Sequence, residues 1–310
     1  MLPRISVVII TYNQENLIKR AIESVLKQSE FLYELVISDD CSIDKTWDII
    51  NQYKNSFPNI IKPYKNDFNL GIFKHIEKTW KYPTGDIIFY LSGDDEFCDG
   101  LFKNTIDFIA QNKIDYTNAS FTIYSDYIAI KPNGKRKVVK NNLITKFNPV
   151  SLKIRKLISN RTTCISKKVL EKFQPVNEIG IFTDGLIDIQ TQIYSEENYY
   201  LPYIGSVYYK NIGIGSRTSR LDGLNSFLTL TKEYRKLIDY WPCEDLIFLK
   251  YLEKRTNFQI HPNIYKYYIL LSLYYKIKFK KYGLKYLIKE TIFLIILFFK
   301  FLGFSKIAHV

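Results

Sequence analysis

Hydrophobic and polar residues alternate over the first hundred positions in a way that predicts strands and helices in turn. Residues 5–10 are a nearly continuous β-branched run, which is typical of a strand covered on both faces in a parallel sheet. Residues 15–28 then place apolar side chains at helical spacing. Further apolar runs predict strands at residues 35–37, 60–64 and 86–91. Strands that alternate with helices at these lengths predict an α/β sheet wound by crossover connections.

The pattern is less regular after residue 100. Residues 121–130 and 137–139 are expected to form a hairpin, because Asn133-Gly134 between them favours a tight turn. Beyond Leu224 only helical patterns continue. The other elements expected in this half are a helix at 152–158, a strand at 162–165, a helix at 182–194, a strand at 199–209 and a glycine-rich loop at 211–216. We therefore expect an α/β domain over residues 1–222 and a helical region over residues 223–310.

Polar clusters follow three of the predicted strands. They are Thr11-Tyr12-Asn13, Ser38-Asp39-Asp40 and Gly93-Asp94-Asp95. In wound α/β sheets, ligands bind beyond the carboxyl ends of the strands, so three such clusters at one edge indicate a binding site.

The Asp94-Asp95 pair is the first candidate for chemistry. Two adjacent carboxylates on a sharp turn repel each other unless a positive charge lies beside them. Mg²⁺ or Mn²⁺ prefers oxygen ligands and fits here when a phosphate fills its other positions. The alternative is a solvated turn in which one acid caps the helix expected near Gly100.

The second acidic cluster suggests recognition of a base. A carboxylate at Asp39 could accept the imide N–H of a uracil or thymine ring, and Tyr12 could stack on that ring. Asp44 is sufficiently explained as a cap of the next helix.

Several motifs in order resemble the family 2 glycosyltransferases. They are SVVIITYN at 6–13, AIESVLKQ at 21–28, DDCSIDKT at 39–46, NLGI at 69–72, and GDII at 85–88 leading to LSGDD at 91–95. The resemblance is dense to about residue 100, looser to about 215, and absent beyond. It implies a GT-A fold, a Rossmann-like wound sheet that binds a nucleoside diphosphate sugar and inverts the anomeric centre.

The resemblance also assigns roles to single residues. Thr11 and Tyr12 would border the base with Asn13 in the same cluster, Asp39 would bind the imide edge, Asp94 would lie near the ribose or sugar, and Asp95 would ligate Mn²⁺ or Mg²⁺ on the diphosphate. The usual Asp-x-Asp-Asp loop reads Ser92-Gly93-Asp94-Asp95 here, so one acid is missing.

The family's catalytic base is an acid that opens a later helix, often written Glu-Asp. Thr183-Asp184 matches this place best and makes Asp184 the candidate base, with Glu178 and Asp188 as competitors. Lys210, Arg217 or Arg220 beside the glycine-rich loop is expected to stabilise the departing diphosphate, with Lys210 and Arg217 as the main candidates. A merely solvated loop is the alternative.

Charge is uneven along the chain. The net charge is +13, and residues 262–310 hold nine lysines and one acid among many aromatic and aliphatic residues. The apolar run at 292–299 is too short to span a bilayer, for which about 20 apolar residues are needed. We expect this region to lie on an anionic membrane surface, with a buried helix as the alternative. The scattered cysteines and the start of the chain favour the cytoplasmic face.

These features together predict an inverting, non-processive enzyme of bacterial surface polysaccharide synthesis, such as capsule or O-antigen. A hexosyl or N-acetylhexosaminyl group would pass from a nucleoside diphosphate sugar, a UDP-sugar above all, to a lipid-linked or oligosaccharide acceptor. Processive relatives carry Gln-x-x-Arg-Trp, which this sequence lacks. One alternative is a sugar-phosphate nucleotidylyltransferase, but the residues after the first strand are not a glycine-rich phosphate loop. The other, a nucleic-acid binder using the basic tail, leaves the acids unexplained, so we expect no nucleic acid as partner.

Overall fold

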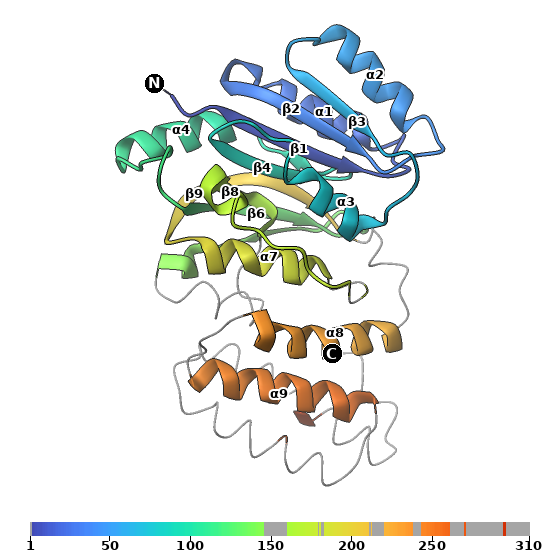
Figure 1. Cartoon of the computed structure of the whole chain (residues 1–310), viewed down its shortest axis with the longest axis vertical. Coiled ribbons are helices and arrows are strands. Elements are labelled where there is room, and N and C mark those ends of the chain that lie inside the picture. The colour runs from blue at the N-terminus through green and yellow to red at the C-terminus, as the bar shows by residue number, and fades with distance from the viewer. Residues whose placement is uncertain are drawn as a thin grey trace. The chain divides into compact units, whose positions relative to one another are not determined.

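The computed structural model describes residues 2–145, 160–178, 180, 183–210, 212, 220–237, 243–260, 270 and 294–295. The chain divides into two compact units (Figure 1). The first contains Met1–Glu178 and Ile187–Arg217, and the second contains Ile179–Leu186 and Thr218–Val310. The predicted division between residues 222 and 223 stays a prediction about independently folding domains.

The first unit is built on a sheet whose described strands run in the order β3-β2-β1-β4-β8-β6-β9-β5, with β7 paired to β6. Strands β1 to β4 are parallel, as the alternation of strands and helices predicts. β8 then pairs antiparallel with β4, and the predicted hairpin is confirmed as β6 and β7. The bounds are β1 (Ile5–Thr11), β2 (Leu32–Asp39), β3 (Ile61–Lys65), β4 (Ile87–Ser92), β5 (Glu96–Phe97), β6 (Phe121–Ile130), β7 (Arg136–Val139), β8 (Thr163–Ser166) and β9 (Glu197–Tyr209).

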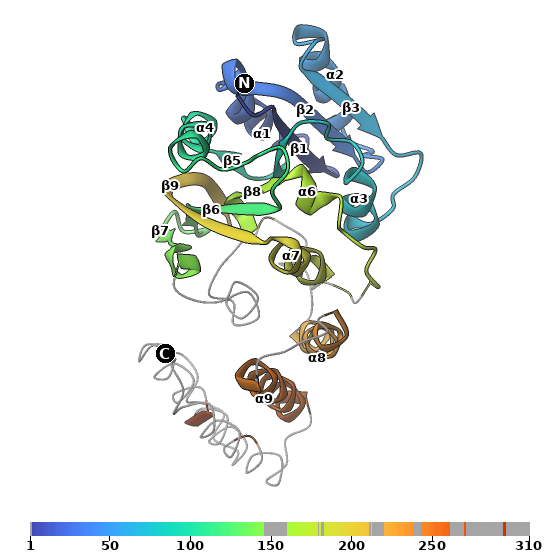
Figure 2. The ribbon, with the colours of Figure 1, turned by 60° about the vertical axis from the view of Figure 1, so that its left-hand side comes forward.

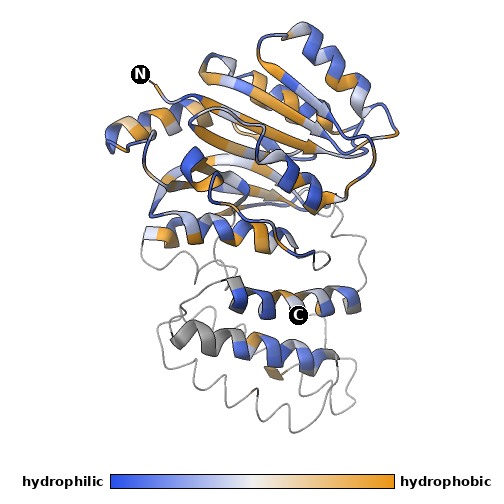
Figure 3. Ribbon diagram, viewed as in Figure 1, coloured by the Kyte–Doolittle hydropathy of each residue, from blue (hydrophilic) through white to orange (hydrophobic). Residues whose placement is uncertain are grey.

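Helices cover the parallel strands on both faces (Figure 2). Successive side chains of a strand point to opposite faces, so Val7 and Ile9 pack beneath α1 (Ile18–Leu26), α2 (Thr46–Ser56) and α4 (Leu101–Gln111). Val8 packs on the other face, with α6 (Lys167–Leu170). α3 (Ile72–Thr79) joins that face because its buried His75 lies 2.7 Å from the Ser38 hydroxyl. Because helices cover both faces of these strands, the strands are largely hydrophobic (Figure 3). Helix α2, by contrast, is mostly hydrophilic.

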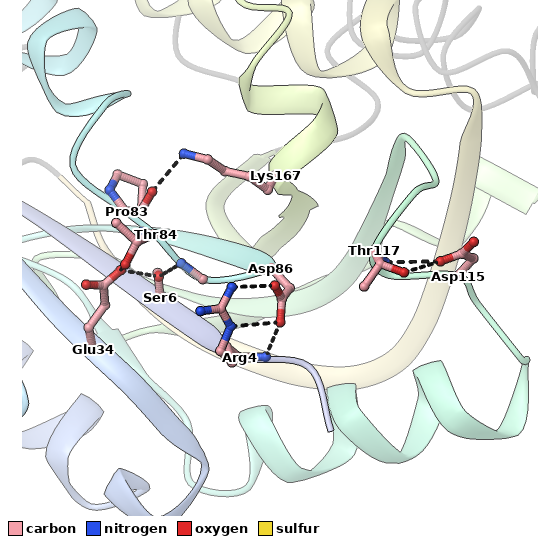
Figure 4. Close-up of polar contacts among 10 residues, drawn as sticks. Arg4, Ser6, Glu34, Pro83, Thr84, Asp86, Asp115, Thr117 and Lys167 are labelled. Atoms are coloured by element: carbon pink, nitrogen blue, oxygen red, sulfur yellow. Dashed lines mark hydrogen bonds and ion pairs between the residues drawn. The ribbon is translucent and has the colours of Figure 1, made fainter. Parts of the chain in front are cut away.

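Polar contacts close the amino-terminal edge of the sheet (Figure 4). Buried Glu34 accepts hydrogen bonds from the Ser6 hydroxyl at 2.6 Å and the Thr84 hydroxyl at 2.9 Å. Arg4 pairs with Asp86 at 2.9 Å, next to β4. These contacts anchor the chain at the start of β1 and β4, at the edge opposite the polar clusters.

The remaining described helices are α7 (Thr183–Tyr194), α8 (Arg220–Leu237) and α9 (Cys243–Ile260), with 3₁₀ turns η1 (Ser29–Phe31), η2 (Asn142–Thr145) and η3 (Asn160–Thr162). Within these described ranges, no helix has the length and apolar character to cross a bilayer. The predicted helix at 152–158, most of the loop at 211–216 and nearly all of the tail beyond residue 260 lie outside the described residues.

Candidate active site

The carboxyl-terminal ends of β1, β2 and β4 lie side by side and form what we call the carboxyl edge. Thr11 is opposite Asp39 in the sheet, and the Asp40 N–H donates to the Thr11 carbonyl at 3.0 Å. On the other side of β1, the Gly93 N–H donates to the Ile10 carbonyl at 2.9 Å. The three polar clusters therefore meet at one edge, as their positions after parallel strands predict.

Hydrogen bonds tie the loop after β1 to the loop after β2. The Asn13 N–H donates to the Ser42 hydroxyl at 2.8 Å, and the Asn13 side-chain carbonyl accepts the Ile43 N–H at 3.0 Å. The Gln14 N–H donates to the Thr46 hydroxyl at 2.8 Å. Asn13 adopts a left-handed φ of 51°, which asparagine tolerates better than most residues. Asn13 thus shapes the loop, and its contact with a donor stays a prediction.

Asp44 completes this connection. Its carboxylate accepts the Thr46 N–H at 3.0 Å and the Glu15 N–H at 3.1 Å, so Asp44 binds the first N–H of α2, although the N-cap position itself is Lys45. In return, the Glu15 carboxylate accepts the Lys45 N–H at 3.0 Å. Burial raises the pKa of Asp44, but the hydrogen bonds from Thr46 and Glu15 outweigh it and hold that pKa below its ordinary value. Asp44 is therefore a structural acid.

Asp39 is fully buried at the end of β2. One carboxylate oxygen accepts the Ser42 N–H at 3.1 Å and the other accepts the Ser42 hydroxyl. Burial raises the pKa of Asp39, and the bonds from Ser42 offset part of that rise. Each carboxylate oxygen has two lone pairs, so Ser42 does not use all the acceptor capacity of Asp39, and its contact with a base stays a prediction. Tyr12 lies on the same edge and is 41% exposed, which leaves its ring open to a base.

Asp94 and Asp95 are both buried, on the turn that follows β4. The Asp95 N–H closes the turn on the Ser92 carbonyl at 3.0 Å, and its carboxylate accepts the Tyr209 N–H at 3.1 Å. Burial, followed by repulsion from Asp94, raises the pKa of Asp95 to about 7. Burial also raises the pKa of Asp94. Because both acids are buried, the alternative of a solvated turn is wrong, and in the first turn of α4 the Phe102 N–H donates to the Gln28 side-chain oxygen at 3.2 Å instead.

A side chain at position 93 would crowd the loop after β1. A Cβ there would lie 2.3 Å from the Gln14 side-chain oxygen and 3.0 Å from the Thr11 hydroxyl. The Thr11 hydroxyl in turn donates to that Gln14 oxygen at 2.8 Å. The loop after β1 and the acidic turn after β4 are therefore in direct contact. This contact fixes Tyr12, the candidate for the base, relative to Asp94 and Asp95, the candidates for the phosphates and sugar.

Two arginines that the sequence patterns do not single out meet the acidic turn. Arg20 of α1 donates to the Asp94 carbonyl at 2.5 Å, and its guanidinium lies 3.8 Å from the centre of the Tyr209 ring. Arg161 of η3 lies 3.7 Å from the Asp95 carboxylate and 3.4 Å from the centre of the Tyr208 ring. Both are positioned by tertiary contacts with β9, so no local motif announces them.

Three further residues belong to the predicted site. Lys210 is exposed just after β9, where its N–H donates to the Ile130 carbonyl at 2.8 Å. Arg217 lies outside the described residues. Asp184 is exposed in the first turn of α7, among the residues of the second unit. Its role as base stays a prediction, as do the competing roles of exposed Glu178 and half-buried Asp188.

The acidic turn fits a divalent cation only in part. Asp94 and Asp95 offer the hard oxygen ligands that Mg²⁺ and Mn²⁺ prefer. Among the described residues, however, no three His, Cys, Asp or Glu side chains are grouped to hold a metal ion. The protein would thus supply one or two ligands, and the phosphates of a bound nucleotide would have to supply others.

Sequence comparison assigns more than half of the chain to one family. The family described as Glycosyl transferase family 2 matches residues 6–173. The UDP-Glc:alpha-D-GlcNAc-diphosphoundecaprenol beta-1,3-glucosyltransferase WfaP of Escherichia coli is 26% identical over 203 residues, which cover 66% of this chain and 79% of that protein. The putative teichuronic acid biosynthesis glycosyltransferase TuaG of Bacillus subtilis is 31% identical over 123 residues, covering 40% of this chain and 47% of TuaG.

Solved structures share the fold. S. aureus TarS 1–349 in complex with UDP-GlcNAc superimposes with a TM-score of 0.61 and 16% sequence identity, covering 88% of this chain and 80% of that one. At this identity the similarity establishes the architecture, and the chemistry of the site must be argued from its own residues.

Proposed function

Because the chain belongs to glycosyl transferase family 2 and has its predicted GT-A fold, we propose that it transfers a sugar from a UDP-sugar to a lipid-linked acceptor. That it is a glycosyltransferase of bacterial glycan synthesis follows from the family and from relatives such as WfaP and TuaG. The observation that carries the proposal is the carboxyl edge, where buried Asp39, Asp94 and Asp95 come together.

Donor recognition is divided between two parts of this edge. Asp39 accepts the imide N–H of the base while Ser42 holds the carboxylate in place, and Tyr12 stacks on the ring. A uracil ring fits this pattern, and both WfaP and the TarS complex have a uridine nucleotide in their names. The diphosphate would then extend from β2 across β1 toward the turn after β4. Asp94 faces the ribose or sugar.

Asp95 would hold Mn²⁺ or Mg²⁺ together with the diphosphate. Such an ion acts as a Lewis acid that compensates the charge of the leaving group. The protein's own part is to present a buried carboxylate oriented by the Tyr209 N–H. Because Ser92 replaces the first acid of the usual loop, the site depends on the nucleotide for its remaining ligands.

Transfer with inversion needs a base on the acceptor side. Asp184 takes the proton of the acceptor hydroxyl as that oxygen bonds to the anomeric carbon. The bond from that carbon to the diphosphate oxygen breaks with its electron pair, so the nucleoside diphosphate leaves. Lys210 and Arg217 are proposed to balance its charge. A non-processive enzyme is proposed because the sequence lacks the Gln-x-x-Arg-Trp motif.

A lipid-linked acceptor accounts for the chemistry of the tail. WfaP is named for a diphosphoundecaprenol acceptor, and the residues after 262 carry nine lysines and one acid. Lysines beside apolar side chains suit an anionic membrane surface, where such an acceptor would be presented. We therefore place the enzyme peripherally, at the cytoplasmic face of the membrane.

A donor screen tests this function. Thermal shift and donor hydrolysis would be measured with UDP-, dTDP- and GDP-sugars, with and without Mn²⁺. We expect a UDP-sugar to raise the melting temperature most, and Asp95→Ala and Asp184→Ala each to abolish transfer, while donor binding survives only in Asp184→Ala.

Asp107→Ala, which removes a half-exposed carboxylate on α4, serves as the matched control and should transfer normally. Stabilisation by none of the sugar nucleotides would contradict the proposal. Full activity of Asp184→Ala would reject Asp184 as base and direct attention to Glu178 and Asp188.

A further inference from the structure

Arg161 has a setting that the donor site as proposed does not use. It lies in η3, immediately before β8, and β8 pairs antiparallel with β4 so that Cys164 is opposite Phe89. Continuing that register places residue 161 opposite Ser92, the last residue of β4, and so beside the acidic turn that follows. The Arg161 guanidinium packs on Tyr208 at 3.4 Å and lies 3.7 Å from the Asp95 carboxylate, with 38% of the side chain exposed.

We propose that Arg161 binds the diphosphate of the nucleotide donor. A guanidinium has five N–H donors in a planar fork that matches two phosphate oxygens at once. Stacking on Tyr208 restricts its orientation, so less freedom is lost when a phosphate is bound. This inference rests on the proposed function, because it assigns a ligand group within the same site.

The charge of the carboxyl edge supports this assignment. A diphosphate brings at least two negative charges to an edge that already holds Asp39, Asp94 and Asp95. The acid missing at Ser92 leaves an expected metal ion with one protein ligand fewer, so a side-chain cation carries more of the compensation. Arg161 lies beside Asp95, the residue proposed to hold the metal ion on the diphosphate, and its side chain is accessible from solvent.

Arg20 differs from Arg161 and has a positioning role instead. It donates to the Asp94 carbonyl and packs on Tyr209 at 3.8 Å. Its Nε is buried and has no hydrogen-bond partner within the described part of the chain. Because Arg20 binds the backbone of the turn, it fixes where the carboxylates stand, whereas Arg161 meets the side chain at which the ligand is expected.

Calorimetric titration of the full chain with UDP and with uridine tests the proposal. For Arg161→Gln we expect UDP binding to weaken about 10- to 100-fold, as for loss of a charge-assisted hydrogen bond, and uridine binding to stay within about twofold. Arg161→Lys keeps the positive charge but loses the planar arrangement of donors, so its affinity for UDP should lie between those of the wild type and Arg161→Gln.

Arg4→Gln is the matched control. Arg4 also pairs with an aspartate, at 2.9 Å from Asp86, and lies over a tyrosine, 4.9 Å from the ring centre of Tyr33, but at the opposite edge of the sheet. It should bind UDP as the wild type does. If Arg161→Gln does not fold, Tyr208→Leu provides the second variant and is expected to weaken UDP binding about three- to tenfold by releasing the guanidinium.

The outcomes separate this inference from the function on which it rests. A wild-type protein that binds no nucleoside diphosphate would overturn both. UDP binding by the wild type that is unchanged in Arg161→Gln, or in Tyr208→Leu where that variant replaces it, would overturn the inference alone. Equal weakening of UDP and uridine would show that Arg161 supports the whole site rather than the diphosphate, and would overturn it as well.

Discussion

At the scale of single residues, the surroundings of Asp95 disfavour its negative charge. It is 7% exposed and stands next to Asp94, and these two features raise its pKa to about 7. The Tyr209 N–H and Arg161 act in the other direction. A carboxylate kept under such conditions is typical of a functional site, because a bound cation relieves the repulsion.

Asp95→Asn should therefore stabilise the metal-free protein in a pH-dependent way. Since the pKa of Asp95 is higher in the folded than in the unfolded chain, the wild type loses stability as pH rises from about 4 to about 7. The Asp95→Asn variant does not lose this stability, because asparagine carries no charge at any of these pH values. In chelator, we expect its free energy of unfolding to exceed that of the wild type by on the order of 1–3 kcal/mol at pH 8 and to show no such gain near pH 4.

Urea denaturation at both pH values measures this difference, with Asp107→Asn as a half-exposed control that should show none. A gain of equal size at both pH values would contradict the assignment of the raised pKa to Asp95.

At the scale of elements, the site depends on how loops are joined to one another. The loop after β1 and the loop after β2 exchange hydrogen bonds through Asn13, Ser42 and Asp44. The turn after β4 packs on the first loop through Gly93 and Gln14. The strands of the sheet hold these loops close together. The side chains of the loops then set the spacing between Asp39 and the Asp94-Asp95 pair.

Asp44→Ala should loosen this connection. It removes the acceptor of both the Thr46 N–H and the Glu15 N–H, which is expected to cost about 1–2 kcal/mol of stability at pH 7. The pKa of Asp44 is lowered in the folded chain, so its contribution is present above about pH 4 and disappears as pH falls through the folded pKa. The variant and the wild type should therefore converge in acid.

Asp48→Ala is the control for this variant, because Asp48 is an exposed acid in the first turn of the same helix. Thermal melting from pH 3 to pH 7 distinguishes the two. An equal loss in Asp48→Ala would assign the effect to the helix dipole rather than to the loop connection.

At the scale of the whole molecule, charge is segregated along the chain. The acidic site lies in the first unit, while the lysine-rich stretch begins after residue 262 in the second. Such a basic segment favours association with anionic lipid, and its apolar residues would add to that affinity. Membrane association remains a prediction from sequence.

A protein truncated after His261 should no longer sediment with vesicles that contain anionic lipid, whereas the full chain should. Neutral phosphatidylcholine vesicles are the control for charge, and we expect weak sedimentation of both proteins with them. A full-length variant with the nine tail lysines changed to glutamine separates charge from apolar contact. Unchanged sedimentation of the truncated protein would remove the membrane argument.

The sequence by itself determined the parallel half of the sheet and most of its polar edge. Residues 5–10 and 86–91 predict β1 and β4 because buried strands need unbroken apolar runs, and local side-chain patterns record that need. Asp39, Asp94 and Asp95 were found in the same way, since they follow such runs directly. The roles of Asp184, Lys210 and Arg217 rest on the family resemblance and remain to be tested.

Only the tertiary structure decided what surrounds the acids. The antiparallel insertion of β8 beside β4 carries Arg161 to Asp95, and β9 brings Tyr208 and Tyr209 to the same turn. Strand order depends on which distant surfaces pack together, and a periodic pattern along the chain contains no record of it. For that physical reason the sequence predicted the carboxylates of the site but not Arg20 and Arg161, which contact the acidic turn.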